Sequence, residues 1–496
     1  MHNKVQFVSS MMARSLPSLA FHVVFCISSL LCLSTCSVNG MGEEDTHHTF
    51  SVRSLLPSTD CFDDSKGTTN RTGLKVYHRH GPCSHSEKAT SANDILAQDQ
   101  SRVDYLHRRT ISASISKNTI NSPSTSQIDD EEYSRSASLP ARSGRSLGSG
   151  NYVVTVGFGT PKRDMSLVFD TGSDLTWIQC QPCASYCYSQ NDPIFDPSGS
   201  ASYANVTCNS PDCSLVSSST GRAPGCSTST CLYAISYGDN SYSVGFFVRD
   251  TITLTPSDVF PGFLFGCGQK NRGLFGEVSG LLGLGREKIS LISQTAQTYG
   301  GVFSYCLPST SSSQPGHLTL GRSARSPPNV LYTPMLTDPN ASNFYYLDLI
   351  AISVKGTQLS IPPSVFSVAG TLIDSGTVIT RLPPAAYSAL RTAFRNEMTA
   401  YPTAPALSIL DTCYDLSGYD TVTVPNVALM FRGGAVLNVV VTGILYAGSA
   451  SQVCLAFAGN SDASDVGILG NVQQTTFEVV YDTSRSLIGF APGGCS

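Results

Sequence analysis

Leu167-Val-Phe-Asp-Thr-Gly-Ser173 and Thr371-Leu-Ile-Asp-Ser-Gly-Thr377 are two copies of one motif, placed in the two halves of a 496-residue chain. Each copy has an apolar follower: Gly280-Leu-Leu-Gly-Leu-Gly285 comes after the first, and Gly467-Ile-Leu-Gly470 comes after the second. A single Asp-Thr/Ser-Gly tripeptide arises by chance in a chain of this length, and two such aspartates could merely shape turns. Matched flanks and matched followers outweigh that alternative, and they predict two similar lobes that each present one carboxylate.

The sequence from about residue 151 onward has the pattern of β-structure. Apolar and polar residues alternate in Thr251–Thr255, and Gly and Ser separate the strand-like runs. One helix stands out at Pro384–Met398, where Tyr387, Leu390 and Phe394 share a face behind an N-terminal proline. The predicted fold is therefore mostly β with a few short helices.

On these motifs, the chain from about Asn151 to its C-terminus resembles the pepsin-like aspartic proteases. The resemblance implies a bilobal, pepsin-like acid protease fold, in which two pseudo-symmetric β lobes have a cleft between them. We expect the N-terminal catalytic lobe over residues 147–330 and the C-terminal catalytic lobe over residues 331–496. The resemblance also implies hydrolysis of peptide bonds without a metal or an organic cofactor, with Asp170 and Asp374 as the catalytic pair.

Two facing carboxylates would supply that chemistry. Like charges a few Å apart cannot both ionise easily, so the pair shares a proton over an acidic range, as in the aspartic proteases that the chain resembles. One carboxylate would then activate a water as the general base, and the other would polarise the scissile carbonyl as the general acid.

Six residues beside the pair have supporting roles in the family. The hydroxyls of Thr171 and Ser375 would bond across the lobes, although the digestive members of the family carry Thr at both positions. Gly172 and Gly376 would let backbone N–H groups approach the carboxylates. The outer carboxylate oxygens would accept hydrogen bonds from Ser173 and Thr377.

A hairpin over Leu232–Gly245 is the candidate for a flap that closes over the cleft. Tyr237 and Gly238 match the tyrosine and glycine of the family's flap. Trp177 is the chain's single tryptophan and follows the first motif, where the family places an indole that can donate to that phenol. These three residues are therefore candidate substrate-binding residues.

The chain has 17 cysteines, of which an even set lies in residues 147–496 without the spacing of a zinc site. This favours six disulfides in an oxidising compartment over the inert thiols of a cytosolic protein. A cysteine-rich insert over about residues 180–231 resembles the nepenthesin-like, atypical aspartic proteases of plants. That resemblance implies the following pairs, although spacing alone leaves the connectivity open: Cys180 with Cys183, Cys187 with Cys267, Cys208 with Cys231, Cys213 with Cys226, Cys306 with Cys495, and Cys413 with Cys454.

The N-terminal third has a different composition from the rest. Lys4 and Arg14 precede the apolar run Leu19–Leu33, which predicts a signal peptide over residues 1–37. Residues 38–146 read as a pro-segment and linker, within which Ile95–Arg109 predicts one amphipathic helix. Its apolar side consists of Leu96, Val103 and Leu106. We expect this pro-segment to inhibit the enzyme, and a disordered spacer without that role remains the alternative.

Together these features predict a secreted aspartic endopeptidase that is made as a zymogen and acts on proteins or peptides at acidic pH. We expect a monomer in the apoplast, with the vacuole as an alternative and the chloroplast less favoured. A membrane partner is not expected. Nucleic acid is not expected as a partner of the mature form, because the body of the chain is acidic. The sequence also contains three candidate glycosylation sites, Asn70, Asn205 and Asn340.

Two alternative functions remain open on the sequence. One is a DNA-associated regulator, for which the only basic candidate is His107–Arg109 in the pro-region, a charge run typical of a solvated helix end. Xylanase-inhibitor proteins have the same bilobal, cysteine-rich fold with a degraded active site, so the chain could be a catalytically inactive binder of glycoside hydrolases. Both Asp motifs and Tyr237 are intact here, which favours the enzyme.

Overall fold

The computed structural model describes residues 46–56, 91–114, 136–139, 141–143, 151–237, 241–273, 275–309, 315–322, 329–338 and 341–495. The chain divides into two compact units, residues 1–46 and 47–496, and the second contains all the described helices and strands. The predicted signal peptide, Asn70, Gly238 and Asn340 lie outside the described residues. No helix in the described part of the chain is long and apolar enough to cross a bilayer.

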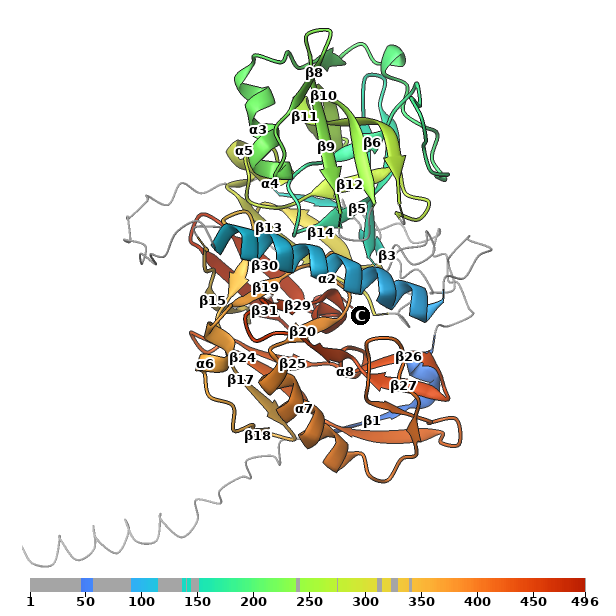
Figure 1. Ribbon diagram of the computed structural model, residues 1–496, viewed down its shortest axis with the longest axis vertical. Helices are drawn as coiled ribbons and strands as arrows, with labels where there is room; N and C mark the ends of the chain where they lie inside the picture. The colour runs from blue at the N-terminus through green and yellow to red at the C-terminus, as the bar shows by residue number, and fades with distance from the viewer. Residues whose placement is uncertain are drawn as a thin grey trace, which may run out of the picture. The chain divides into compact units, whose positions relative to one another are not determined.

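The internal repeat forms the same strand arrangement twice. β5 (Arg163–Asp170) runs parallel to β12 (Gly280–Gly283), and β19 (Thr371–Ile373) runs parallel to β29 (Gly467–Leu469). In each copy the motif strand therefore pairs with its follower. This equivalence confirms the prediction of two similar β lobes, which Figure 1 shows above and below the blue helix α2 (Ala92–Ser114).

The N-terminal lobe is built on a ten-stranded sheet in the order β3-β4-β5-β12-β6-β11-β10-β9-β8, with β7 beside β10. Side chains of β9 and β10 are alternately buried and partly exposed along most of their length, because one face of these strands packs on the core. The helices of this lobe are α3 (Pro211–Thr220), α4 (Leu291–Gln294) and α5 (Ala296–Tyr299), with η3 (Pro197–Gly199) before them. Its other strands are β3 (Ala141–Ser143), β4 (Tyr152–Phe158), β6 (Trp177–Gln179), β7 (Ala204–Asn205), β8 (Gly225–Ser227), β9 (Thr230–Ser236), β10 (Tyr242–Thr255) and β11 (Asp258–Arg272).

The C-terminal lobe has three smaller sheets, with the strand orders β16-β19-β29-β20-β28, β18-β17-β24-β25 and β21-β22-β27-β26. The helix predicted at Pro384–Met398 is α7 (Pro384–Glu397), and its Tyr387, Leu390 and Phe394 are buried as expected. The remaining helices are α6 (Ser364–Ser367), α8 (Val441–Ile444) and η4 (Asn471–Gln474). The remaining strands are β16 (Tyr346–Leu347), β17 (Leu349–Val354), β18 (Thr357–Gln358), β20 (Thr380–Leu382), β21 (Thr403–Ala404), β22 (Cys413–Tyr414), β23 (Thr421–Pro425), β24 (Val427–Phe431), β25 (Val436–Val439), β26 (Leu445–Ser449), β27 (Gln452–Leu455) and β28 (Phe457–Gly459).

A six-stranded sheet combines strands from both halves of the sequence, in the order β15-β31-β30-β13-β14-β2. Aromatic rings pack on it below the catalytic motifs: Phe303 stacks on Tyr481 with ring centroids 4.4 Å apart, and the Tyr305 hydroxyl lies 3.0 Å from the Tyr481 hydroxyl. This packing gives both motifs a common rigid base. Its strands are β2 (Ala137–Leu139), β13 (Val302–Cys306), β14 (His317–Leu320), β15 (Leu331–Pro334), β30 (Glu478–Asp482) and β31 (Leu487–Ala491).

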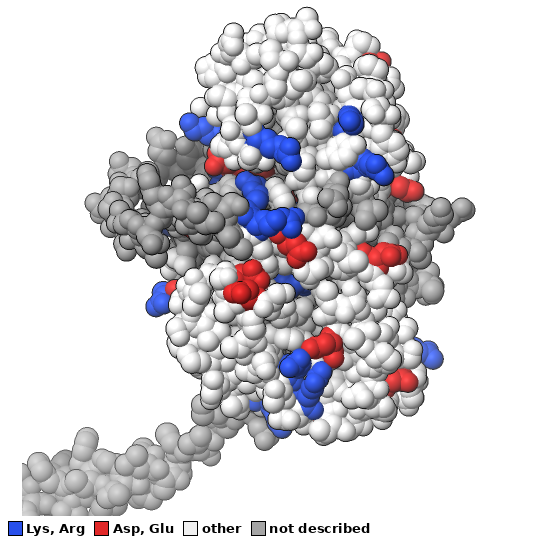
Figure 2. Space-filling model, in the orientation of Figure 1, with Lys and Arg blue, Asp and Glu red and all other residues white. Residues whose placement is uncertain are grey.

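The segment before the catalytic lobes contributes three elements that dock on the C-terminal lobe. β1 (His47–Ser51) pairs antiparallel with β23, and η1 (Val52–Leu55) follows it with Val52 and Leu55 buried. The predicted amphipathic helix is α2, and its Leu96, Val103 and Leu106 are buried as expected. Figure 2, in the same orientation, shows a mostly uncharged surface with basic and acidic side chains across its middle, where α2 lies in Figure 1.

Six disulfides form, but four of the implied pairs are wrong. Cys180 bonds to Cys267. The two cysteines are close because β6 runs parallel to β11 with Ile178 opposite Cys267, so that Cys180, just after β6, lies beside β11. The neighbouring loop then closes on itself through Cys183 and Cys187.

In the cysteine-rich insert, the burial of each cysteine distinguishes the two disulfide pairs. Cys213 on α3 and Cys231 on β9 are both buried and bond to each other, while the exposed Cys226 bonds to the half-buried Cys208. The two pairs in the rest of the fold, Cys306–Cys495 and Cys413–Cys454, form as the resemblance implied.

Candidate active site

The two motifs place their aspartates side by side at the ends of equivalent strands. Asp170 ends β5 and Asp374 follows β19, and both side chains are almost completely buried. Each carboxylate accepts a hydrogen bond from a backbone N–H two residues later, Gly172 to Asp170 Oδ1 and Gly376 to Asp374 Oδ1, both at 3.0 Å. A Cβ at Gly376 would lie 2.4 Å from Asp170 Oδ1, so only glycine lets the two loops approach this closely.

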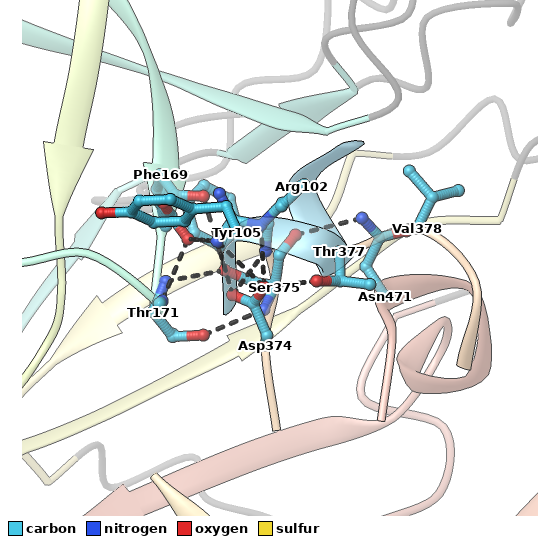
Figure 3. Close-up of polar contacts among 12 residues, drawn as sticks. Arg102, Tyr105, Phe169, Thr171, Asp374, Ser375, Thr377, Val378 and Asn471 are labelled. Carbon is cyan, nitrogen blue, oxygen red and sulfur yellow. Dashed lines mark hydrogen bonds and ion pairs between the residues drawn. The ribbon is translucent and has the colours of Figure 1, made fainter. Parts of the chain in front are cut away.

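The inner hydroxyls link the two loops reciprocally. Thr171 N donates to Ser375 Oγ at 3.1 Å, and Ser375 N donates to Thr171 Oγ1 at 2.9 Å. Ser375 Oγ also donates to the Phe169 carbonyl oxygen at 3.4 Å. Serine therefore makes the cross-lobe bond that the family makes with threonine, and Figure 3 shows both loops meeting at this point.

The outer hydroxyls differ between the lobes. Thr377 Oγ1 donates to Asp374 Oδ2 at 2.5 Å, as expected. Ser173 Oγ also acts on Asp170 as a hydrogen-bond donor that favours the ionised form, although the geometry of this contact is looser than that of Thr377. The Ser173 hydroxyl therefore has the expected effect on the Asp170 carboxylate, whose Oδ1 accepts from Gly172 N and from Arg102.

The flap residues come together as the family resemblance implied. Trp177 Nε1 donates to the Tyr237 hydroxyl at 2.8 Å. Phe275 packs edge-on against both rings, with centroid distances of 4.9 Å to Trp177 and 5.5 Å to Tyr237. The phenol is thus held above the N-terminal side of the site by an aromatic cluster.

Arg102 enters the site from α2 and binds both aspartates. Its Nη2 donates to Asp170 Oδ1 at 2.7 Å and to Asp374 Oδ1 at 3.0 Å, and its Nε donates to Asp374 Oδ2 at 2.9 Å. Figure 3 shows the guanidinium between the two motifs, where a substrate carbonyl and a water would have to lie. The space at the catalytic pair is therefore filled by this chain's own side chain.

Comparison with known proteins identifies the fold and its family. Residues 152–322 match the family model described as Xylanase inhibitor N-terminal, and residues 344–492 match Xylanase inhibitor C-terminal. An aspartyl protease family protein of Arabidopsis thaliana is 53% identical, over 96% of this chain and 98% of that protein. The aspartic proteinase nepenthesin-2 of Nepenthes gracilis is 38% identical, over 70% of this chain and 78% of that protein. The chain belongs to the nepenthesin-like plant aspartic proteases.

Solved structures show the same fold at lower identity. Conglutin gamma from lupine seeds superposes with a TM-score of 0.55 at 25% identity, over 72% of this chain and 94% of that chain. Basic 7S globulin from soybean superposes with a TM-score of 0.56 at 22% identity, over 72% of this chain and 96% of that chain.

The protease is an aspartic endopeptidase, as its relatives are named. An inactive xylanase-inhibitor-like binder is not favoured, because both motif aspartates are present and adjacent. Within the described ranges, no His, Cys, Asp and Glu side chains gather in a group that could hold a metal ion.

The two carboxylates of the protease have opposite electrostatic environments. Burial raises the pKa of Asp170 above its ordinary value, with Arg102 opposing the rise and the charge of Asp374 adding to it. Burial also acts on Asp374, but Arg102 together with the bonds from Thr377 and Gly376 outweighs it and holds the pKa of that carboxyl below its ordinary value. Asp374 is thus the carboxylate that stays ionised more readily.

Asp99 is the second charged residue through which α2 binds the C-terminal lobe. Its carboxylate accepts hydrogen bonds from Val378 N at 2.6 Å and Ile379 N at 3.1 Å, and it pairs with Arg381 at 3.0 Å. Burial raises the pKa of Asp99, and Arg381 and the two backbone donors oppose that rise.

The sequence reasoning assigned an inhibitory role to the pro-segment but missed Arg102 and Asp99. The sequence did contain an indication of their role. Asp99 and Arg102 lie three residues apart on one predicted helix, beside its apolar stripe, and a basic side chain there could pair with the two catalytic carboxylates.

Proposed function

We propose that this protease is made as a secreted zymogen in which Arg102 blocks Asp170 and Asp374, and that it hydrolyses protein or peptide substrates at acidic pH once α2 has been removed. The observation that carries the proposal is the contact of one guanidinium with both carboxylates. A side chain in this position excludes the water and the scissile carbonyl, so catalysis requires its departure.

In the mature enzyme the two carboxylates would divide the work of acid and base. Asp374 keeps the hydrogen bonds from Thr377 and Gly376, which favour its charged form, so it would take the proton from the attacking water. Asp170 is buried and has a raised pKa, so it would carry the shared proton and donate to the carbonyl oxygen. Trp177 would hold Tyr237 over the bound peptide.

The same contact supports activation by acid. In the zymogen the pKa of Asp374 lies below its ordinary value, so the ion pair with Arg102 is complete above the ordinary pKa of a free Asp, about 3.9. As pH falls through the lowered value, protonation removes this stabilisation and the docked state loses its advantage. Protonation of Asp374 therefore favours conversion below about pH 4, whereas the raised pKa values of Asp170 and Asp99 favour the docked helix as pH falls toward that value.

The pro-segment, the compartment and the boundaries belong to the same proposal. The disulfides suit an oxidising compartment, and the apolar run after Arg14 would direct secretion. We place the catalytic lobes at residues 147–330 and 331–496, and we expect the protein to be a monomer. We also expect glycans at the exposed Asn205 and at Asn70 and Asn340.

The test is proteolysis of a generic protein substrate by the purified chain after a step from pH 7 to pH 3.5, with and without pepstatin. Asp170→Asn and Asp374→Asn should each lose at least ~1,000-fold in kcat, because each removes one member of the acid–base pair. Exposed Asp164→Asn is the control and should retain full activity. Pepstatin-insensitive cleavage, or activity retained in either dyad variant, would exclude the mechanism.

A further inference from the structure

A binding site for a carboxylate lies beside the catalytic pair, and in this structure it holds the side chain of Asp99. Its donors are Val378 N, Ile379 N and Arg381 Nη2, at 2.6, 3.1 and 3.0 Å. All three donors belong to the C-terminal lobe, whereas the acceptor belongs to α2. Asp99 is 3% exposed and Arg381 is 1% exposed, so the contact is closed to water.

Departure of α2 would leave these donors without their acceptor. Arg381 Nη1 keeps its bond to the Ile379 carbonyl at 3.0 Å, but Nη2 loses both Asp99 and Gln100. The buried Nε has no hydrogen-bond partner even while α2 is docked. A guanidinium in a desolvated position without a counter-charge is unfavourable, so the vacated site favours another carboxylate.

The internal repeat gives Arg381 a structural counterpart in the N-terminal lobe. β12 brings Leu281 opposite both Val168 and Trp177, and β29 brings Ile468 opposite both Leu372 and Arg381. Val168 and Leu372 each lie two residues before the aspartate of their motif. Arg381 therefore occupies the position in the C-terminal lobe that Trp177, the partner of the flap tyrosine, occupies in the N-terminal lobe.

We propose that Arg381, with the N–H groups of Val378 and Ile379, is a specificity-determining subsite that binds the acidic side chain of a Glu or Asp in the substrate. This inference rests on the proposed function, because it requires the removal of α2 from the mature enzyme. Asp99 and Arg102 are separated by a helical rise of about 4.5 Å, and an extended peptide advances roughly 3.3 Å per residue. The acidic residue therefore lies within three positions of the scissile bond.

A cavity of about 400 Å³ adjoins this site and gives room for a side chain longer than that of Asp99. From the C-terminal lobe it is lined by Arg381, Asn460 and the acidic Asp465, which pairs with His107 while α2 is docked. Gln100, Val103, Asp104, His107 and Arg108 line it from α2. The wall that α2 supplies would open when the helix leaves, so a Glu could reach Arg381 from the substrate cleft.

The experiment compares acid-matured enzymes on internally quenched peptides that carry Glu or Gln at each of the three positions on either side of one scissile bond. All peptides are amidated, so that only a side chain supplies the carboxylate. The variant is the double substitution Asp99→Asn with Arg381→Gln, which leaves no unpaired buried charge in the zymogen. The matched control is Asp99→Asn alone, whose mature form is identical to the wild type if α2 is removed.

At pH 5 the wild type and the control should prefer Glu over Gln by about tenfold or more in kcat/KM at one position, since hydrogen bonds to a charged group have that strength. The preference should fall to near unity in the double variant, and in the wild type as pH decreases through about 4.3, where Glu protonates. A wild type without any Glu preference, or an equal preference in the double variant, would overturn the subsite. If the proposed function is wrong, no peptide is cleaved, and the subsite is then excluded as well. Cleavage of the Gln peptides shows that the enzyme is active, so the Glu preference then tests the subsite alone.

Discussion

At the scale of single residues, Asp174 shows how burial changes the chemistry of a carboxyl in this protease. It is fully buried just after the first motif, where Glu287 N donates to Oδ1 at 2.9 Å and Asn343 Nδ2 lies 3.4 Å from Oδ2. Burial raises the pKa of Asp174 to about 7, against the pull of these bonds. The side chain is therefore mostly neutral at the acidic pH at which we expect the enzyme to work.

This raised pKa predicts a pH-dependent contribution to stability. Between about pH 4 and pH 7 the folded state binds a proton at Asp174 that the unfolded state has released, so the free energy of unfolding falls as pH rises through this window. The full effect is at most on the order of 4 kcal/mol. Asp174→Asn should remove it, so the variant should gain stability over the wild type as pH increases from 5 to 7.

Urea denaturation of the zymogen at pH 5, 6, 7 and 8 measures this difference, with exposed Asp164→Asn as the control. A gap between Asp174→Asn and the wild type that stays constant across these pH values would contradict the account of Asp174.

At the scale of elements, α2 docks through apolar side chains as well as through its two charged residues. Leu96 packs among residues of the C-terminal lobe that include Val378 and Ile379, and Val103 and Leu106 pack against Leu372 and Ile468. The helix thus contacts both the motif strand β19 and its follower β29. Its burial explains why a segment outside the catalytic lobes holds a fixed position over the site.

Leu106→Ala should loosen this helix, because truncation of a buried leucine costs about 2–5 kcal/mol. We expect amide hydrogen exchange in α2 at pH 7 to accelerate by roughly 30-fold or more, since local opening becomes easier by that energy. Exposed Asp104→Ala on the same helix is the control and should change exchange little. Equal exchange in the two variants would show that the apolar face does not hold α2.

The sequence predicted those elements whose signal is local. The two motifs and their followers predicted the paired strands, and the apolar stripe predicted α2. The contact of Trp177 with Tyr237, 60 residues away, was implied by the family resemblance. Periodicity and motif spacing carry this information because they are set by neighbouring residues.

The contacts of Arg102 were outside that reach, because they join residues 68 and 272 positions apart and depend on how α2 docks. The four mispaired disulfides were missed for a related reason. Cys226 and Cys231 lie opposite each other across β8 and β9, and only the burial of each cysteine separates the possible partners.

At the scale of the whole molecule, the residues before the catalytic lobes grip the C-terminal lobe at two separate places. β1 pairs antiparallel with β23 along its whole length, from His47 to Ser51. α2 covers the catalytic pair. The segment that we propose to be inhibitory is therefore held both at the site and away from it. This arrangement keeps the local concentration of Arg102 at the dyad high until the segment is cut.

The central claim is that Arg102 keeps the protease latent, and pepstatin binding to the intact zymogen tests it most directly. Pepstatin must occupy the space at Asp170 and Asp374 that the guanidinium fills, so the intact wild-type chain at pH 5 should bind it weakly. Arg102→Ala should bind at least about 100-fold more tightly, since the variant loses charge-assisted bonds to both carboxylates, whereas exposed Arg108→Ala should match the wild type. Equal pepstatin affinity in the wild type and Arg102→Ala would contradict the account.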